Sequence, residues 1–226
     1  MAVVDAKRLA AQRAADFVMD GMKVGLGTGS TVYWTIFKIG QRVREGLRIK
    51  CFATSRETER IAKEAGITVF DVAQMDGLDL CIDGADEVDP NLSLIKGGGG
   101  ALFREKVVAT ASDRMIVVAD ASKQVDVLGK FPLPVETVPF GAHLTRRRIE
   151  AMGCRAALRL SEEGEPLVTD NGNHILDCQF DRISDPFGLH SRLKAEVGVV
   201  ETGLFVGIAS MAIFSDGQRV WEERRG

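Results

Sequence analysis

The sequence predicts an α/β protein: a Rossmann-like, mostly parallel sheet domain joined to a smaller ferredoxin-like α+β domain. Two observations carry this prediction. Over the first 130 residues, short apolar runs alternate with amphipathic helical segments, the pattern of a parallel sheet covered on both faces. Prolines at positions 132, 134 and 139 then mark a linker, beyond which the pattern becomes β-α-β-β-α-β. We expect residues 1–130 and 205–226 in the first domain and 131–204 in the second.

In the first domain, hydrophobic periodicity and turn residues place helices and strands in alternation. Asp5 is a candidate cap for the first helix, and Gly21 a candidate end. The expected helices are 5–20, 30–43, 55–65 and 101–111, and the expected strands are 23–26, 49–53, 67–70, 78–82 and 115–119.

The second domain follows the same logic. Its expected strands are 135–140, 155–160, 174–180 and 199–202, and its expected helices are 143–152 and 186–197. Two further apolar runs in 205–222 are expected to return to the first domain.

Composition excludes several classes of protein. With 45% hydrophobic and 27% charged residues, the chain is neither disordered nor collagen-like. Its net charge of −3 offers nothing to nucleic acid or to an anionic membrane, although a local basic site could bind a small anion. The stretch 203–214 is too short to span a bilayer, and no signal peptide is expected. The four cysteines contain no C-x-x-C pair and the three histidines are scattered, so we expect reduced cysteines, a cytoplasmic protein and no metal site.

The first motif of chemical interest is Gly25-Leu-Gly-Thr-Gly-Ser-Thr31, which follows a strand and opens a helix. Glycines there let a ligand approach the backbone, and a helix N-terminus presents N–H groups to an anion. A P-loop would need Lys at position 29, and a dinucleotide fingerprint would need Gly at position 30. A monophosphate site therefore fits better than NAD or ATP, the alternative being a tight turn with a serine N-cap.

The second motif, Asp83-Gly-Ala-Asp86-Glu-Val-Asp89, lies at the end of a strand, where open α/β sheets bind ligands. The acids could bind sugar hydroxyls, transfer protons or form a solvated turn. Asp83 and Asp86, nearest the strand, are the better candidates.

The third motif is Lys96 followed by four glycines, with Glu105 about one turn into the next helix. Four glycines in a row cost chain entropy, and close approach of a substrate is one reason for them. An ammonium and a carboxylate beside such a loop suit proton abstraction next to a carbonyl. Lys7 and Lys123 could complete a phosphate site, although lone lysines are more often solvated.

Together, GLGTGST, DGADEVD, KGGGGALFREK, ADASKQVDVLGKFPLPVE and VTDNGNHILD resemble the type A ribose-5-phosphate isomerases over nearly the whole chain. The resemblance implies a catalytic domain with a small lid domain, no cofactor, a homodimer or homotetramer, and interconversion of ribose 5-phosphate and ribulose 5-phosphate in the pentose phosphate pathway. Gly100 and Phe103 depart from the residues common in the family at their positions.

By motif position, the resemblance implies Glu105 as the general base, with Asp83, Asp86 and Lys96 as the other catalytic residues. Asp83 is expected to assist ring opening, and Lys96 with glycine N–H groups to stabilise an enediolate. The substrate-binding residues so implied are Lys7, Thr28, Gly29, Ser30, Thr31, Asp83, Gly84, Ala85, Asp86, Lys96, Gly97, Gly98, Gly99 and Lys123.

Two alternatives come from related folds. A non-catalytic sugar-phosphate sensor would normally carry a DNA-binding helix-turn-helix, for which no room exists before Asp5. A coenzyme A transferase would use a glutamate nucleophile that forms a thioester, which hydroxylamine would trap.

Overall fold

A computed structural model describes residues 2–225. The chain divides into two compact units. The first contains the described residues of Met1–Ala85, Arg104–Gln124 and Gly207–Gly226, and the second contains Asp86–Phe103 and Val125–Val206. Each unit is described by itself below.

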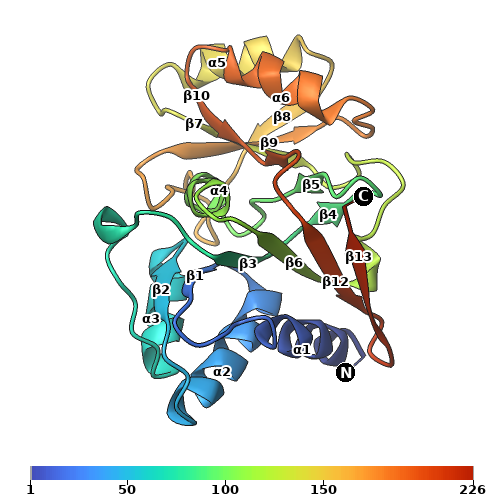
Figure 1. Cartoon of the computed structure of the whole chain (residues 1–226). Coiled ribbons are helices and arrows are strands. Elements are labelled where there is room, and N and C mark those ends of the chain that lie inside the picture. The colour runs from blue at the N-terminus through green and yellow to red at the C-terminus, as the bar shows by residue number, and fades with distance from the viewer. Residues whose placement is uncertain (1, 226) are drawn as a thin grey trace. The chain divides into compact units, whose positions relative to one another are not determined.

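A six-stranded sheet in the order β13-β12-β6-β3-β1-β2 forms the centre of the first unit (Figure 1). All neighbouring strands pair in parallel except β12 and β13. The strands are β1 (Lys23–Leu26), β2 (Lys50–Ala53), β3 (Leu80–Gly84), β6 (Met115–Asp120), β12 (Met211–Ser215) and β13 (Val220–Arg224). The C-terminal strands β12 and β13 belong to this sheet, whereas Phe205 and Val206 belong to the second unit.

Helices cover both faces of this sheet because its strands are apolar on both sides. On one face, Val24, Leu26, Leu80 and Ile82 form a buried core with apolar residues of the first two helices. On the other face, Val108 of α4 contacts Gly25 of β1 so closely that a Cβ at position 25 would lie 2.4 Å from its methyl group. The helices of this unit are α1 (Ala2–Ala15), α2 (Ser30–Arg44), α3 (Arg56–Glu64) and α4 (Leu102–Thr110), the last beginning with two residues of the second unit.

The second unit contains a four-stranded antiparallel sheet in the order β10-β7-β9-β8. With α5 (Ala142–Glu150) and α6 (Pro186–Lys194), the chain order is β-α-β-β-α-β, so this unit has the expected ferredoxin-like topology (Figure 1). Its strands are β7 (Leu133–Thr137), β8 (Arg155–Leu158), β9 (His174–Gln179) and β10 (Val199–Thr202). The predicted fold class is thus confirmed.

Side chains alternate between the two faces of this smaller sheet. Leu133, Val135, Leu176 and Cys178 form the core with Ile149 of α5 and the leucines of α6. The residues between them in sequence, such as Pro134 and Asp177, therefore lie on the opposite face.

Three differences from the sequence-based expectations have physical causes. Residues 86–103 and 125–130 belong to the second unit, since β4 (Glu87–Val88) and β5 (Leu94–Ile95) form a small sheet with β11 (Leu204–Phe205). The expected strand 67–70 is reduced to a single bridge from Val69 to Cys51, because the chain turns at once into a 3₁₀ helix (Val72–Gln74). Helix α1 begins before Asp5, so that residue lies inside the helix rather than capping it, and the helix ends at Ala15 rather than near Asp20.

Within residues 2–225, no helix has both the length and the apolar character needed to cross a membrane.

Candidate active site

The carboxyl ends of three parallel strands gather the predicted residues of the first unit at one edge of the sheet. After β1 the chain goes to β2 on one side, and after β3 it goes to β6 on the other, so the strand order reverses between β1 and β3. Ligands of open α/β sheets bind at such a reversal. Leu26 pairs with Ile82, which places the glycine turn after β1 beside Asp83. Lys123 follows the carboxyl end of β6, the strand next to β3.

Gly27 and Asp83 are in direct contact. A Cβ at position 27 would lie 2.0 Å from Oδ1 of Asp83 and 2.6 Å from its Cβ, so only glycine fits. The fully buried Asp83 carboxylate accepts hydrogen bonds from the N–H groups of Thr28 (3.1 Å) and Gly84 (2.7 Å). The turn and the carboxylate therefore fix each other's position.

Helix α2 begins directly after the turn, with Gly29 at the N-cap and a φ of 121° there. No side chain caps the helix, so the alternative interpretation of the motif, a serine N-cap, is wrong. Ser30 is instead the first helical residue, and its hydroxyl accepts a hydrogen bond of 2.9 Å from Nζ of Lys7 on α1. The N–H groups of a first helical turn have no partner within the helix. Together with a lysine ammonium, they form a suitable site for a phosphate.

A cavity of about 470 Å³ opens beside this helix start. Four of the predicted residues line it, together with aromatic and aliphatic side chains and with Glu57 and Thr58 of α3. The predicted residues are Lys7, Thr28, Gly29 and Ser30. The space thus combines one polar end with apolar walls, as small-molecule sites commonly do.

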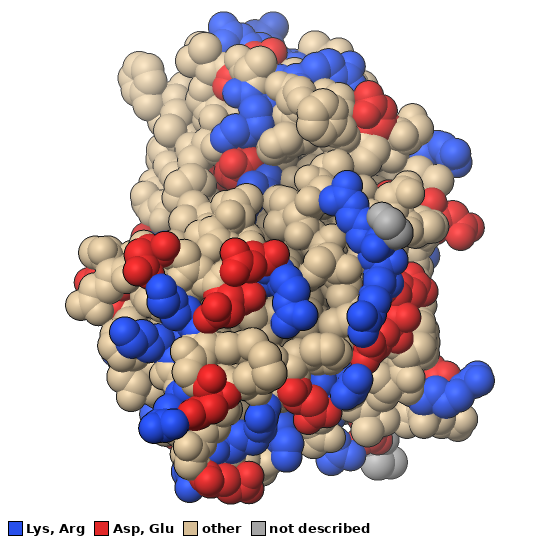
Figure 2. Space-filling view, viewed as in Figure 1, with Lys and Arg blue, Asp and Glu red and all other residues tan. Residues whose placement is uncertain are grey.

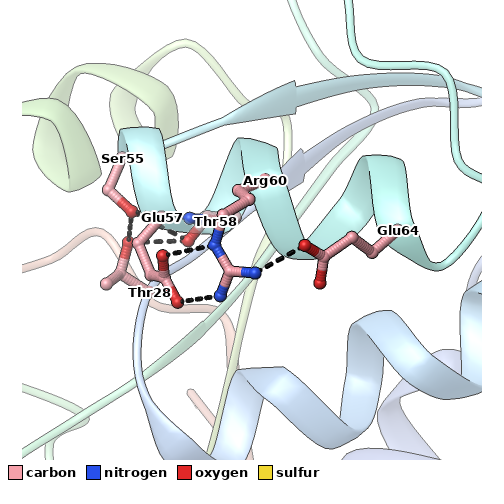
Figure 3. A network of polar contacts seen from close by, with 6 residues as sticks. All are labelled: Thr28, Ser55, Glu57, Thr58, Arg60 and Glu64. Atoms are coloured by element: carbon pink, nitrogen blue, oxygen red, sulfur yellow. Dashed lines mark hydrogen bonds and ion pairs between the residues drawn. The ribbon is translucent and has the colours of Figure 1, made fainter.

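Thr28 has a part that sequence reasoning missed. Its hydroxyl lies within hydrogen-bond distance of Ser55 (2.9 Å) and Thr58 (3.0 Å) (Figure 3). It also lies 2.8 Å from the Thr54 hydroxyl, and the Thr58 hydroxyl donates to the carbonyl of Gly27 at 2.8 Å. Ser55 also caps α3 by accepting from the N–H of Thr58. The Thr28 side chain therefore ties the turn to α3, whereas its backbone N–H supports Asp83.

Charged side chains of α3 surround this cluster on the outside. Arg60 forms ion pairs with Glu57 and Glu64, each at 2.6 Å, and all three are more than half exposed (Figure 3). The pairing lowers the pKa of Glu57. Exposed pairs at helical spacing stabilise the helix only slightly, and Glu57 is the member of this network that lines the cavity.

Two further predicted residues of the first unit, the acid Glu105 and the hydroxyl residue Thr31, are buried. Glu105 lies in the first turn of α4 and is 2% exposed, and Thr31 in the first turn of α2 is 9% exposed. A carboxylate removed from water is a candidate for proton transfer, because its protonation responds strongly to its surroundings.

The second unit holds the remaining predicted residues. Lys96 is 2% exposed, with Nζ 5.4 Å from the ring centroid of Phe205. Gly97–Gly100 form a turn closed by the N–H of Gly100 and the carbonyl of Gly97 at 3.0 Å. The N–H of Gly98 donates to Oδ2 of Asp86 at 2.8 Å, so the turn and Asp86 are joined. Gly97 and Gly100 have positive φ angles of 102° and 81°, which explains the glycine at position 100.

The other two acids of DGADEVD, Glu87 and Asp89, accept hydrogen bonds from backbone N–H groups. Glu87 is buried and accepts from the N–H groups of Gly129 (2.7 Å) and Phe131 (2.6 Å). Asp89 accepts from those of Asn91 and Ser93. Asp83 and Asp86 also accept backbone N–H bonds, and the preference for them as functional candidates rests on their place at and just after the end of β3.

Arg159 and Asp177 are the main residues of the second unit that sequence reasoning missed. Arg159 donates to the carbonyls of Gly97 (2.7 Å) and Gly98 (3.1 Å) and forms a two-bond ion pair with Asp177. Arg159 stands out by no sequence signal, since Arg155 on the same expected strand is also charged, whereas Asp177 ends the VTDNGNHILD stretch, to which no role was assigned.

Among residues 2–225, no group of three or more His, Cys, Asp and Glu side chains is placed to hold a metal ion. The four cysteines are free thiols. Burial raises the pKa of Cys51 to about 12, as expected for a core residue. In the view of Figure 2, acidic and basic side chains are interspersed.

The described site can be compared with known proteins. A family model described as ribose 5-phosphate isomerase A (phosphoriboisomerase A) matches residues 50–219. A protein of Bacillus mycoides named ribose-5-phosphate isomerase A is 53% identical over 212 residues, covering 93% of this chain and 96% of its own length. One of the same name from Parvibaculum lavamentivorans is 52% identical over 215 residues, covering 92% and 93%.

Solved structures agree with these relatives. A D-ribose-5-phosphate isomerase in complex with phospho-erythronic acid is 37% identical, with a TM-score of 0.96 and full coverage of both chains. Ribose 5-phosphate isomerase A from Neisseria gonorrhoeae is 36% identical, with a TM-score of 0.93 and coverage of 100% and 99%. The glycine turn, the buried acids and these likenesses lead to one conclusion: the chain belongs to the ribose 5-phosphate isomerase A family of aldose–ketose isomerases.

Proposed function

We propose that this chain interconverts D-ribose 5-phosphate and D-ribulose 5-phosphate. One observation carries most weight: the Lys7–Ser30 hydrogen bond at the start of α2, next to a turn locked onto the buried Asp83. This arrangement joins a phosphate-binding helix start to a carboxylate that can contact sugar hydroxyls.

The reaction moves one proton between neighbouring carbons. In the direction of ribulose 5-phosphate, Asp83 assists the transfer of the ring hydroxyl proton that opens the furanose. Glu105 then removes the proton from C2, and the electron pair forms a C1–C2 double bond while the aldehyde oxygen at C1 gains negative charge. Return of the proton to C1 and transfer of the C2 hydroxyl proton to the C1 oxygen give the ketose, so atoms and electrons balance without an external oxidant.

Charge on the enediolate oxygens is the main barrier to this reaction. In our proposal, Lys96 and the N–H groups of Gly97–Gly99 stabilise that charge, with Asp86 holding the turn through Gly98. Lys96 is suited to the part because it is buried, where a positive charge acts more strongly than in water.

The phosphate is proposed to bind the first turn of α2 and Lys7, with Ser30, Thr31 and Lys123 contributing donors. Gly29, Gly84 and Ala85 would then lie along the sugar, as implied by motif position. Phospho-erythronic acid, present in one solved relative, should bind here as well, because its carboxylate carries charge where the enediolate does.

A coenzyme A transferase and a non-catalytic sensor are not favoured, because the relatives and solved structures reported above bear the isomerase name. Free cysteines support the proposal of a cytoplasmic enzyme. We further propose a homodimer or homotetramer without nucleic-acid or membrane partners, as the family resemblance implies.

The test is NMR of ribose 5-phosphate in D₂O with purified enzyme. We expect ribulose 5-phosphate signals to appear and deuterium to enter at the exchanging carbon. Addition of hydroxylamine with an acyl-coenzyme A should leave the protein mass unchanged, whereas a hydroxamate on a glutamate would support the transferase. Absence of ribulose 5-phosphate would overturn the proposal.

A further inference from the structure

The glycine turn Gly97–Gly100 rests on one face of the small antiparallel sheet of the second unit. Pro134 of β7 and Ile175 of β9 come within 4 Å of the Cβ positions of Gly97 and Gly100, at 3.2 and 3.9 Å. The backbone is attached at the same place, because the N–H of Lys96 donates to the carbonyl of Gly203 and the N–H of Gly203 donates to that of Pro134. This sheet face therefore determines where the turn lies.

One charged side chain on that face reaches the turn itself. Arg159, two residues beyond Ala157 of β8, donates from Nη1 to the carbonyls of both Gly97 and Gly98. Its Nε and Nη2 bind the two oxygens of Asp177 on β9, so the planar guanidinium is held along both edges. The Arg159 side chain is only 13% exposed, and that of Asp177 26%. An arginine held in this way has one orientation and aims its remaining donors in a fixed direction.

Because peptides are planar, the contact with Arg159 also determines the direction in which the N–H groups of the glycine turn point. No peptide among the described residues is cis, and in a trans peptide the C=O and the following N–H point in opposite directions. Arg159 holds the Gly97 carbonyl, and the N–H of the same peptide, that of Gly98, points away from Arg159 and meets Asp86. By the same rule, holding the Gly98 carbonyl directs the N–H of Gly99 away from Arg159, at the exposed tip of the turn.

Without Arg159, little would fix the orientation of the peptide between Gly98 and Gly99. Glycine accepts both signs of φ, so the central peptide between Gly98 and Gly99 can rotate by about 180° between two turn types at small cost. Rotation would put a carbonyl where the Gly99 N–H now lies, which would repel a developing oxyanion instead of stabilising it.

We propose that Arg159, held by Asp177, is a positioning residue that sets the peptide orientation of the glycine turn and so aims the Gly99 N–H at the substrate oxyanion. The inference rests on the proposed function, in which this turn contacts the enediolate. It gives the small antiparallel sheet, through Arg159, a part in catalysis that no sequence motif indicated.

The test compares Arg159→Met, which keeps the aliphatic stem, with Arg159→Lys, which keeps a charge and can reach one carbonyl. We expect Arg159→Met to lower kcat by roughly 10–100-fold, somewhat less than outright loss of an oxyanion donor. The KM for ribose 5-phosphate should change less than about threefold, because the phosphate binds elsewhere. Arg159→Lys should recover part of kcat. Arg155→Met on the same strand is the matched control, since Arg155 is 85% exposed and makes no contact with the turn, and it should retain wild-type kcat.

A crystal structure of Arg159→Met gives the second readout, and we expect the Gly98–Gly99 peptide to be rotated or present in two orientations. The proposal is overturned if kcat stays within about twofold of wild type, or if kcat falls while the peptide keeps its orientation. If Arg159→Met does not fold, Asp177→Asn decides: it removes the charge that aligns Arg159 and should lower kcat with KM unchanged, and a wild-type kcat would refute the inference. Failure of the proposed function would look different, because the wild-type enzyme itself would then form no ribulose 5-phosphate.

Discussion

Replacing Gly27 with alanine tests the contact between the glycine turn and the Asp83 carboxylate. The added methyl group would lie 2.0 Å from Oδ1 of Asp83 and 2.6 Å from its Cβ. Because the Asp83 Cβ is fixed to the backbone of β3, rotation of the side chain cannot relieve the second overlap. Either the carboxylate leaves its place or the two strands separate.

The expected cost follows from the bonds that would break. Displacing the carboxylate removes at least one of its hydrogen bonds from the N–H groups of Thr28 and Gly84, each contributing about 1.5–3 kcal/mol for a charged acceptor. Separating the strands would cost about 1–3 kcal/mol, the usual range for an overpacked core. At about 2–4 °C per kcal/mol for a chain of this length, Tm should fall by roughly 2–12 °C. We expect kcat/KM to fall at least about 100-fold, since both the phosphate turn and Asp83 are displaced by more than the ångström that commonly costs this much.

The assay combines thermal unfolding with isomerase kinetics. Gly84→Ala serves as the matched stability control, because the nearest atom to its added methyl group would be 3.8 Å away, an ordinary contact. Its free energy of unfolding should stay within about 1 kcal/mol of wild type. A Gly27→Ala enzyme with unchanged Tm and kcat/KM would refute the reasoning, since it would show that the turn and Asp83 move without cost.

Three further predictions concern the base, the phosphate site and the thiols. Glu105→Gln should lower kcat by roughly 10²–10⁴-fold with little change in KM. Glu64→Gln, on the exposed face of α3, is the control. A Glu105→Gln enzyme that keeps half of the wild-type kcat would point to Asp83 or Asp86 as the base. Thr31→Ile should raise the KM for ribose 5-phosphate at least about tenfold, because a hydrogen bond to a charged group is lost. Thr35→Val, one turn along α2, should leave this KM unchanged. If unphosphorylated ribose turned over as fast as ribose 5-phosphate, the turn would have another role. In titration with a thiol reagent at pH 8, Cys154 should react first, because it is half-buried and the neighbouring Cys178 thiol lowers its pKa. Cys51 should react only at pH values near its pKa of about 12. Rapid loss of the Cys51 thiol at pH 8 would contradict the burial argument.

Local sequence patterns determined most elements of this protein, because they record which side of each segment faces a core. The bounds of β1 and β10 were predicted to the residue, and those of α2, α4 and β6 to within one or two residues. The ferredoxin-like order of the second unit likewise followed from the chain order of helices and strands. Short strands that pair with distant parts of the chain were harder to predict. The strands β4, β5 and β11 have two residues each, too few to show a hydrophobic period.

The chemistry of the site divides in a similar way. Glycine runs and acids at strand ends are visible in the sequence because they violate ordinary helix and strand composition. Lys7 and Ser30 could be nominated separately, but only the packing of α1 against α2 brings their side chains within 2.9 Å. Likewise, only the fold shows which backbone N–H groups Glu87 and Asp89 bind.

Arg159 shows what the sequence by itself could not determine. Arg159 and Gly97 are 62 positions apart, and nothing local distinguishes Arg159 from the solvated Arg155 four residues earlier. The fold decides the difference, because β8 pairs with β9 so that Ala157 faces Asp177, and Arg159, two residues further along, reaches both Asp177 and the glycine turn. Local pattern thus identified the groups that could do chemistry, whereas long-range pairing alone decided which side chains hold those groups in place, since such contacts depend on tertiary packing and leave no period in the chain.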